Sequence, residues 1–291
     1  MATSTAITSV LLLVVAVTAQ DSDWRHIAKQ YTHVDVGPQR GSALRTVGGT
    51  PTKPDHFPHH VYIQVQNDST RSYCSGAIIS EKHVITAAHC TKGSQVTAIV
   101  AGVVNLADTK DRVVRRVAWS EYYPRFKEER IANDIVLLEV DKAFPKDSTG
   151  VQPIGVRDIL GKPTDNCVVS GWVRSPVSKH FYLESMKVPL WPDRICTMIH
   201  PSQKQDTVCA GNAVNNGDNC MRDRSSILVC NGRLAGIANI DIPCNQADFP
   251  QSYTELAYYK DWLDRTMYND IEFDTRSGSG FGSNDENDSE D

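Results

Sequence analysis

A mostly β-structured globular domain, ended by one C-terminal helix, is the fold that this sequence predicts. The chain has 291 residues with 40% apolar content, which can bury a sizeable core. Short β-branched runs recur from residue 46 to about residue 254, separated by Gly, Pro, Asn and Asp clusters. All eight cysteines fall between Cys74 and Cys244, and an even number suits four disulfides in an oxidising compartment.

The first residues predict a secretory signal over 1–19. The apolar run Val10–Val17 is followed by Val17-Thr18-Ala19, which offers small residues before a cut after Ala19. The run is shorter than the ~20 apolar residues that span a bilayer. Residues 20–45 are polar and contain no cysteine, and we expect them to form a pro-segment that ends at Arg45. The protein is therefore expected to be secreted and extracellular.

Strand-like runs follow one another closely after the pro-segment, which favours a barrel or a sandwich. The runs are HVYIQV, GAIISEKHVITAA, QVTAIVAGVV, DIVLLEV, NCVVSGWV, SILVC and LAGIANI.

The one predicted helix closes the domain, within TELAYYKDWLDRTMY. Its apolar residues recur near helical spacing, and Thr254 is expected to be its N-cap.

Charge is concentrated at the C-terminus. Residues 274–291 hold six acidic residues and one Arg, so their net charge of −5 equals that of the whole chain. The rest of the chain is neutral overall, which gives no electrostatic footprint for nucleic acid or for an anionic membrane surface. Residues 271–291 are rich in Gly, Ser, Asn and acid, and we expect this tail to be disordered.

Several polar motifs contain residue types that bind metals, but we predict no metal and no cofactor from them. His56, His59 and His60 are interpreted as a surface turn that enters a strand. Asn105, Asp108 and Asp111 do not complete an oxygen shell for calcium, because the apolar Val103 and the spacing interrupt it. Two Asn-X-Ser sequons are acceptors for glycan in a secreted chain, at Asn67 and Asn287.

Three separated motifs resemble those of the trypsin/chymotrypsin family. They are VITAAHC with His89, NDIVLLEV with Asp134, and DNCMRDRSSILVC, in the family's chain order. The resemblance runs from about Thr46 to Met267 and includes RTVGG, CVVSGW, TVCAGN and LAGI. It implies a trypsin-like domain over 46–270, an all-β fold of two six-stranded antiparallel Greek-key barrels with a C-terminal helix. It also implies the disulfides Cys74–Cys90, Cys167–Cys230, Cys196–Cys209 and Cys220–Cys244.

The resemblance assigns His89 to the general base and Asp134 to the carboxylate that orients it. Acyl transfer also needs a nucleophile and an oxyanion hole. The family's Gly-Asp-Ser-Gly-Gly-Pro is here RDRSSI, residues 222–227, so Arg224 occupies the nucleophile position and Arg222 replaces the oxyanion-hole glycine. A protonated guanidinium cannot attack a carbonyl. His89 and Asp134 are then either inherited packing residues or part of a binding site.

The neighbouring Ser225 is not expected to act in place of the nucleophile, because its side chain points elsewhere and reactive geometry is held to about 0.5 Å.

The specificity pocket of the family has remnants here. Asp218 matches the carboxylate that pairs with substrate Arg or Lys, but Asp241 and Gln251 stand where the family has entrance glycines. We expect the pocket to be narrowed or filled. A buried Asp218 then needs a partner, such as an internal cation or an ordered water. We hypothesise that Arg222 or Arg224 folds over the cleft and pairs with a carboxylate, which is one of Asp218, Asp241 or Asp134.

The activation site is retained in part. Arg45-Thr46 is a trypsin-type bond, and Asp223 matches the residue that captures the released N-terminal ammonium. Thr46 replaces the usual Ile or Val, and burying its hydroxyl has a cost. Cleavage, or an inherited and unused bond, both remain open.

Two functions follow from these residues. The first is a secreted, non-catalytic protease homologue that binds an extracellular protein, such as a protease, an inhibitor or a cascade component, as cofactor, decoy or scaffold. The alternative is a residual trypsin-like endopeptidase with basic-residue preference. A duplicate that folds without a selected function is a third reading.

Overall fold

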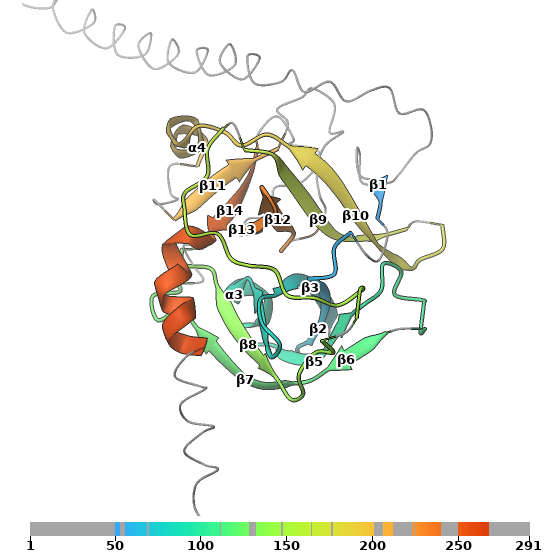
Figure 1. The fold of residues 1–291 in the computed structure, drawn as a ribbon. Coiled ribbons are helices and arrows are strands. Elements are labelled where there is room, and N and C mark those ends of the chain that lie inside the picture. The colour runs from blue at the N-terminus through green and yellow to red at the C-terminus, as the bar shows by residue number, and fades with distance from the viewer. Residues whose placement is uncertain are drawn as a thin grey trace, which may run out of the picture.

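Two antiparallel β-barrels make up the described part of the chain, with the C-terminal helix along one side (Figure 1). The computed structural model describes residues 50–52, 56–68, 70–110, 112–127, 132–146, 148–163, 165–175, 177–200, 206–211, 223, 225–239 and 250–267. Within these ranges no helix is long and apolar enough to cross a membrane.

The first barrel has the strand order β6-β5-β2-β3-β4-β8-β7. Its β2 shows why the sequence folds this way, because alternate side chains at Val61, Ile63 and Val65 are at most 1% exposed. Only Arg116 separates β6 from β7, so the two form one bent strand that closes a six-stranded barrel. The bounds are β2 His60–Gln66, β3 Arg71–Ile78, β4 His83–Thr86, β5 Gln95–Ala101, β6 Val113–Arg115, β7 Val117–Tyr122 and β8 Val136–Val140.

The second barrel has the order β1-β10-β9-β12-β13-β14-β11. A bridge from Leu190, just after β10, to Ala210 in β11 closes it. The two-residue β1 is an addition at the edge, so the predicted six-stranded barrel is confirmed here as well. The bounds are β1 Thr50–Pro51, β9 Cys167–Arg174, β10 Phe181–Val188, β11 Thr207–Ala210, β12 Ile227–Cys230, β13 Arg233–Ala238 and β14 Gln251–Glu255.

Short helices lie between these strands and after the last one. They are α3 Ala88–Thr91, α4 Asp193–Ile199 and the 3₁₀ turn η3 Leu256–Tyr259, which continues as α-helix over 260–267. The predicted C-terminal helix is therefore present, but the expected cap at Thr254 is wrong. Thr254 is the fourth residue of β14, and its hydroxyl donates to the carbonyl of Asp134 at 3.3 Å. Strand pairing with Thr207 holds its backbone extended, so the helix begins two residues later.

The C-terminal helix joins the two barrels. It follows the last strand of the second barrel, yet Leu256, Tyr259 and Leu263 belong to the apolar core of the first. Tyr123 makes edge-to-face contacts with Tyr259 and Trp262, at ring distances of 4.9 and 5.4 Å. The indole of Trp172 in β9 also donates to the carbonyl of Val61 in β2, at 3.2 Å. These contacts fix the barrels against each other.

Three of the disulfides implied by the resemblance are present, Cys74–Cys90, Cys167–Cys230 and Cys196–Cys209. The fourth, Cys220–Cys244, lies outside the described residues. The interpretation of His59 and His60 as part of a surface turn is wrong, because they are only 7% and 2% exposed. Both sit where the chain enters β2 between the barrels, and only His56 is exposed.

Candidate functional site

The imidazole of His89 and the carboxylate of Asp134 form a close pair. His89 lies in α3, which begins two residues after the end of β4, and Asp134 lies two residues before the start of β8. The backbone N–H of His89 donates to Oδ1 of Asp134 at 2.8 Å, and Nδ1 lies 2.6 Å from Oδ2. Asp134 is fully buried, while the His89 side chain is 23% exposed.

Asn133 determines how Asp134 enters the site. Its φ is +56°, in the left-handed region that Asn tolerates better than most residues. Its amide donates to the carbonyl of Arg125 at 3.0 Å, and the hydroxyl of Tyr259 donates to its Oδ1 at 3.2 Å. The C-terminal helix therefore helps to hold the turn that presents Asp134.

The pair is chemically competent to accept a proton. Because Nδ1 of His89 donates its hydrogen bond to the carboxylate of Asp134, the proton of the neutral imidazole lies on Nδ1 and the lone pair on Nε2. Nε2 makes a contact of 3.7 Å with Sγ of Cys90. The imidazole is therefore oriented for general-base chemistry, which also needs a group that it can deprotonate.

The nucleophile loop is described only at Asp223 and from Ser225 onward, and Arg222 and Arg224 lie outside the described residues. Asp223 is 3% exposed. Its carboxylate accepts from the N–H groups of Trp172 at 2.7 Å and Ser225 at 3.1 Å, and from the hydroxyl of Ser75. Burial raises the pKa of Asp223, and these hydrogen bonds oppose the rise.

Ser225 is fully buried and bonded within the core. Its Oγ accepts the N–H of Ser75 at 2.7 Å and lies 3.4 Å from Oδ1 of Asp223. Among the described residues no hydrogen bond joins Ser225 to His89. This arrangement commits the hydroxyl of Ser225 to contacts within the core.

A buried polar network continues behind Asp223, and sequence reasoning missed it. Nε2 of His60 lies 2.8 Å from the hydroxyl of Ser75, and Nδ1 lies 3.0 Å from the hydroxyl of Ser170. Burial, and then the neighbouring His59, lower the pKa of His60 well below its usual value. No sequence signal pointed to the network, because its residues come from β2, β3 and β9, far apart in the chain.

The expected pocket and activation residues are described only in part. Gln251 is half-buried in β14, and its amide lies 3.4 Å from the carbonyl of Ser252. Asn239 is buried, and its Oδ1 accepts the hydroxyl of Ser252 at 2.6 Å. Outside the described residues lie Arg45, Thr46, Asp218, Cys220, Asp241, Cys244 and Asn287.

The remaining polar motifs occupy turns. Asn67 lies exposed between β2 and β3, and its Oδ1 accepts the hydroxyl of Thr70 at 2.6 Å. The amide of Asn105 donates to Oδ1 of Asp108 at 3.3 Å, while Asp111 is not described. In the described ranges, no group of three or more His, Cys, Asp or Glu residues is arranged to hold a metal ion.

The chain shares its fold and sequence with serine proteases. Residues 46–263 match the family described as Trypsin. Kallikrein-14 of Homo sapiens is 31% identical over 207 residues, which cover 68% of this chain and 75% of that protein. Trypsin II-P29 of Gallus gallus is 29% identical, with 77% and 89% covered, and serine protease SP24D of Anopheles gambiae is 30% identical, with 77% and 81% covered.

Solved structures agree with these relatives. The structure titled "neuropsin, a serine protease expressed in the limbic system of mouse brain" superposes with a TM-score of 0.63 at 26% identity. The superposition covers 75% of this chain and 98% of the neuropsin chain. A second structure, titled "Structure of GrC", gives a TM-score of 0.67 at 25% identity, with 76% and 99% covered.

Proposed function

This chain belongs to the trypsin family, and from that premise we propose that it is a secreted, non-catalytic homologue that acts by binding an extracellular protein. Its partner would be a protease, an inhibitor or another component of an extracellular protease pathway. The observation that carries the proposal is Arg224 at the nucleophile position, beside a Ser225 whose hydroxyl is committed to the core.

The loss of the nucleophile supports this function most directly. The guanidinium of Arg224 stays protonated and has no lone pair to attack a carbonyl. Ser225 is buried and bonded to Ser75, so its exposure to a substrate would break a buried hydrogen bond. The oriented pair of His89 and Asp134 then has no hydroxyl to activate.

The oxyanion position supports the same conclusion. Arg222 replaces the glycine that the family uses there, and a side chain restricts the backbone and crowds a substrate. Removing a single oxyanion donor costs ~3 to 4 kcal/mol of transition-state stabilisation. The change at 224 therefore removes the nucleophile, and the change at 222 disfavours the backbone conformation in which its N–H would serve the oxyanion hole.

A plugged cleft is part of the proposal. Arg222 and Arg224 bring cations to the loop, and Asp241 brings a carboxylate to the region of Asp218. We propose that one of these arginines pairs with Asp218, Asp241 or Asp134 and closes the former substrate cleft. A structure with both guanidiniums more than about 6 Å from all three carboxylates, beyond ion-pair range, would remove this part.

Secretion is proposed on independent grounds. The apolar run Val10–Val17 precedes small residues, and the described cysteines are paired in disulfides. Disulfides persist in oxidising compartments.

A residual endopeptidase is the second candidate, and the intact His89–Asp134 pair favours it. The test uses chain cleaved after Arg45, an Arg-containing amide substrate and a fluorophosphonate probe, with an active trypsin as positive control. We expect neither turnover nor labelling of the unmutated chain. The variant R222G/R224S restores the family's residues at both positions and is expected to become labelled.

A matched control separates chemistry from binding. In R222G/R224S, the further change His89→Ala should abolish labelling, because the serine then has no base. Labelling of the unmutated chain that is lost in its own His89→Ala variant would establish the endopeptidase and end the non-catalytic proposal.

A further inference from the structure

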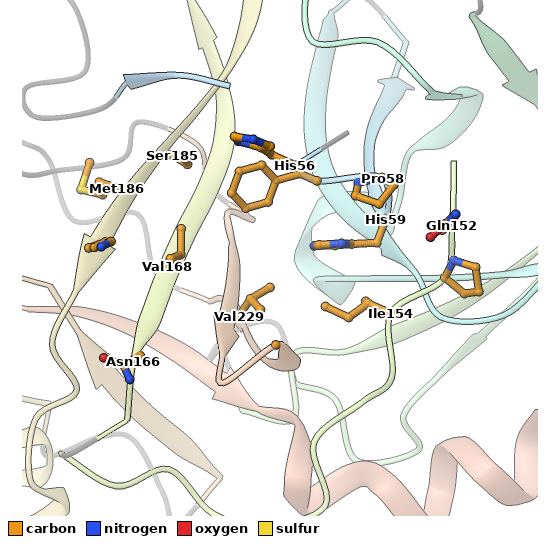
Figure 2. A pocket seen from close by; sticks show the side chains of 14 residues that line it. His56, Pro58, His59, Gln152, Ile154, Asn166, Val168, Ser185, Met186 and Val229 are labelled. Carbon is orange, nitrogen blue, oxygen red and sulfur yellow. The ribbon is translucent and has the colours of Figure 1, made fainter. Parts of the chain in front are cut away.

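A pocket of about 620 Å³ lies between the two barrels and shares no residue with the His89–Asp134 site (Figure 2). One wall is formed by residues 56–59, which lead into β2, and by residues 152–154. The other wall is formed by residues of β9, β10 and β12. Its volume falls within the range of sites that hold small organic ligands.

The centre of the pocket is apolar. Figure 2 shows His59 and Ile154 on one side, facing Val168 and Val229 on the other. Val168 and Val229 are paired across β9 and β12, so the strands fix that wall. The opposite wall is held by backbone hydrogen bonds, from Gln152 N–H to Pro58 at 2.9 Å and from Ile154 N–H to Ile78 at 2.9 Å. One wall of the pocket is therefore fixed by paired strands, and the other by connecting segments that backbone hydrogen bonds hold in place.

One buried polar atom in this wall has no partner. His59 is 7% exposed, and its Nε2 makes no hydrogen bond to any described residue. Phe57 holds the ring edge-to-face at 6.0 Å. Burial lowers the pKa of His59 to about 4, so the imidazole is neutral at physiological pH. A buried nitrogen without a partner carries a desolvation cost that a ligand with a matching polar group removes.

The charge around the pocket has one sign. Lys187 of β10 is exposed at its border and carries a positive charge, and the described lining residues include no Asp or Glu. Asn166, Gln152 and Ser185 supply the neutral polar atoms. An apolar interior with a basic border selects an apolar ligand that carries a single negative charge.

We propose that this pocket binds a small amphipathic organic acid, with its apolar body between Ile154, Val168 and Val229 and its carboxylate directed to Lys187 and His59. The neutral imidazole supplies an N–H to the carboxylate in the tautomer that carries the proton on Nε2. This inference does not rest on the proposed function, because the pocket is separate from the former catalytic cleft.

Octanoate and 1-octanol are the probes, because they share an alkyl chain and differ in the carboxylate. Calorimetric titration of each into the full chain is expected to show octanoate binding about tenfold more tightly, the effect of one charge-assisted hydrogen bond.

Three variants locate the binding. Val229→Phe fills the apolar centre and should abolish octanoate binding. His59→Phe keeps a ring but removes its nitrogen, and should weaken octanoate by about tenfold with little effect on octanol. Lys187→Met keeps the stem without the charge and should weaken octanoate by about threefold, because the ammonium is exposed. Lys142→Met, an exposed lysine outside the pocket, is the matched control. Thermal melts confirm that each variant is folded.

The outcomes decide the proposal. It is overturned when octanoate fails to bind at millimolar concentration, when octanol binds equally well, or when binding survives in folded Val229→Phe. An effect of Lys142→Met as large as that of Lys187→Met also overturns it, since general attraction to a cationic surface would then explain the affinity. Loss of octanoate binding in Val229→Phe, together with a selective loss in His59→Phe, supports it.

Discussion

Ser225 directly follows Arg224 in the sequence. The role of its hydroxyl is set by the buried groups around it more than by its intrinsic reactivity. Side chains that are neighbours in sequence can face opposite environments. Ser225 faces the core and satisfies the buried N–H of Ser75 at 2.7 Å. A serine that carries a core hydrogen bond is a structural residue, although it directly follows Arg224 in the sequence.

This role predicts the effect of Ser225→Ala. The variant leaves the N–H of Ser75 unsatisfied in a buried site, so the free energy of unfolding should fall by about 1 to 3 kcal/mol. Chemical denaturation of the variant and the unmutated chain measures the difference. Ser72→Ala, an exposed serine in the same strand as Ser75, should change it by less than about 0.5 kcal/mol. Equal effects of the two variants would contradict the structural role.

His59 predicts a pH dependence of stability. Burial lowers its pKa from 6.5 to about 4. Between these values the unfolded chain binds the proton and the folded chain does not, so the free energy of unfolding falls as the pH drops from 6.5 toward 4. A shift of this size corresponds to about 3 kcal/mol.

The measurement compares stability against pH for the unmutated chain and His59→Phe. In His59→Phe, the free energy of unfolding should fall less steeply as the pH drops from 6.5 to about 4, because the contribution of His59 is missing. His60, with its lowered pKa, and Asp223, with its raised pKa, act in opposite directions, and both remain in each protein. The difference between the two curves therefore reports His59 together with its effect on the pKa of His60. Parallel curves would count against the burial of His59 as a neutral group.

At the scale of elements, the C-terminal helix links the candidate site to both barrels. The hydroxyl of Tyr259 bonds to Asn133, the residue that turns Asp134 into place, while Thr254 bonds to the Asp134 carbonyl from the strand before the helix. The packing of this helix therefore supports the geometry of the His89–Asp134 pair.

Leu263→Ala tests the packing of this helix. Leu263 is fully buried against the first barrel, so its truncation should lower the free energy of unfolding by about 2 to 5 kcal/mol. Arg265→Ala, on the exposed face of the same helix, should lower it by less than about 0.5 kcal/mol. Urea denaturation measures both, and similar midpoints for the two variants would show that the helix is not packed as described.

At the scale of the whole molecule, disulfides join elements that the chain separates. Cys167–Cys230 links β9 to β12 across 63 residues, and Cys196–Cys209 links α4 to β11. Cross-links that close long loops restrict the unfolded chain most. The fold therefore combines buried apolar clusters with disulfides that cross-link the second barrel.

Cys220 and Cys244 are predicted to form the fourth bridge. Alkylation of the denatured, unreduced chain should modify none of the eight cysteines. Proteolytic mapping should recover Cys220 and Cys244 in one linked peptide that separates on reduction. Two alkylated cysteines at these positions would refute the pairing and leave the loop that carries Arg224 without its tie.

Much of the architecture was predictable from local pattern and motif. Alternating apolar residues in β2 define a half-buried strand, and the HVITAAHC and NDIVLLEV segments, through their family resemblance, indicated the pair of His89 and Asp134 before any geometry was known. The cap at Thr254 was not predictable, because strand pairing with β11 overrides the local capping preference of threonine.

The sequence alone determined the family and, through its motifs, the identities of His89, Asp134 and Arg224 at their motif positions, because each is a property of residue identity. Only the tertiary structure decided that Ser225 is a core residue, that His60 joins Ser75 to Ser170, and that His59 lines a pocket with an unpartnered nitrogen. These facts depend on burial and on contacts between distant strands. A linear pattern records neither, because burial is set by the packing of the two barrels.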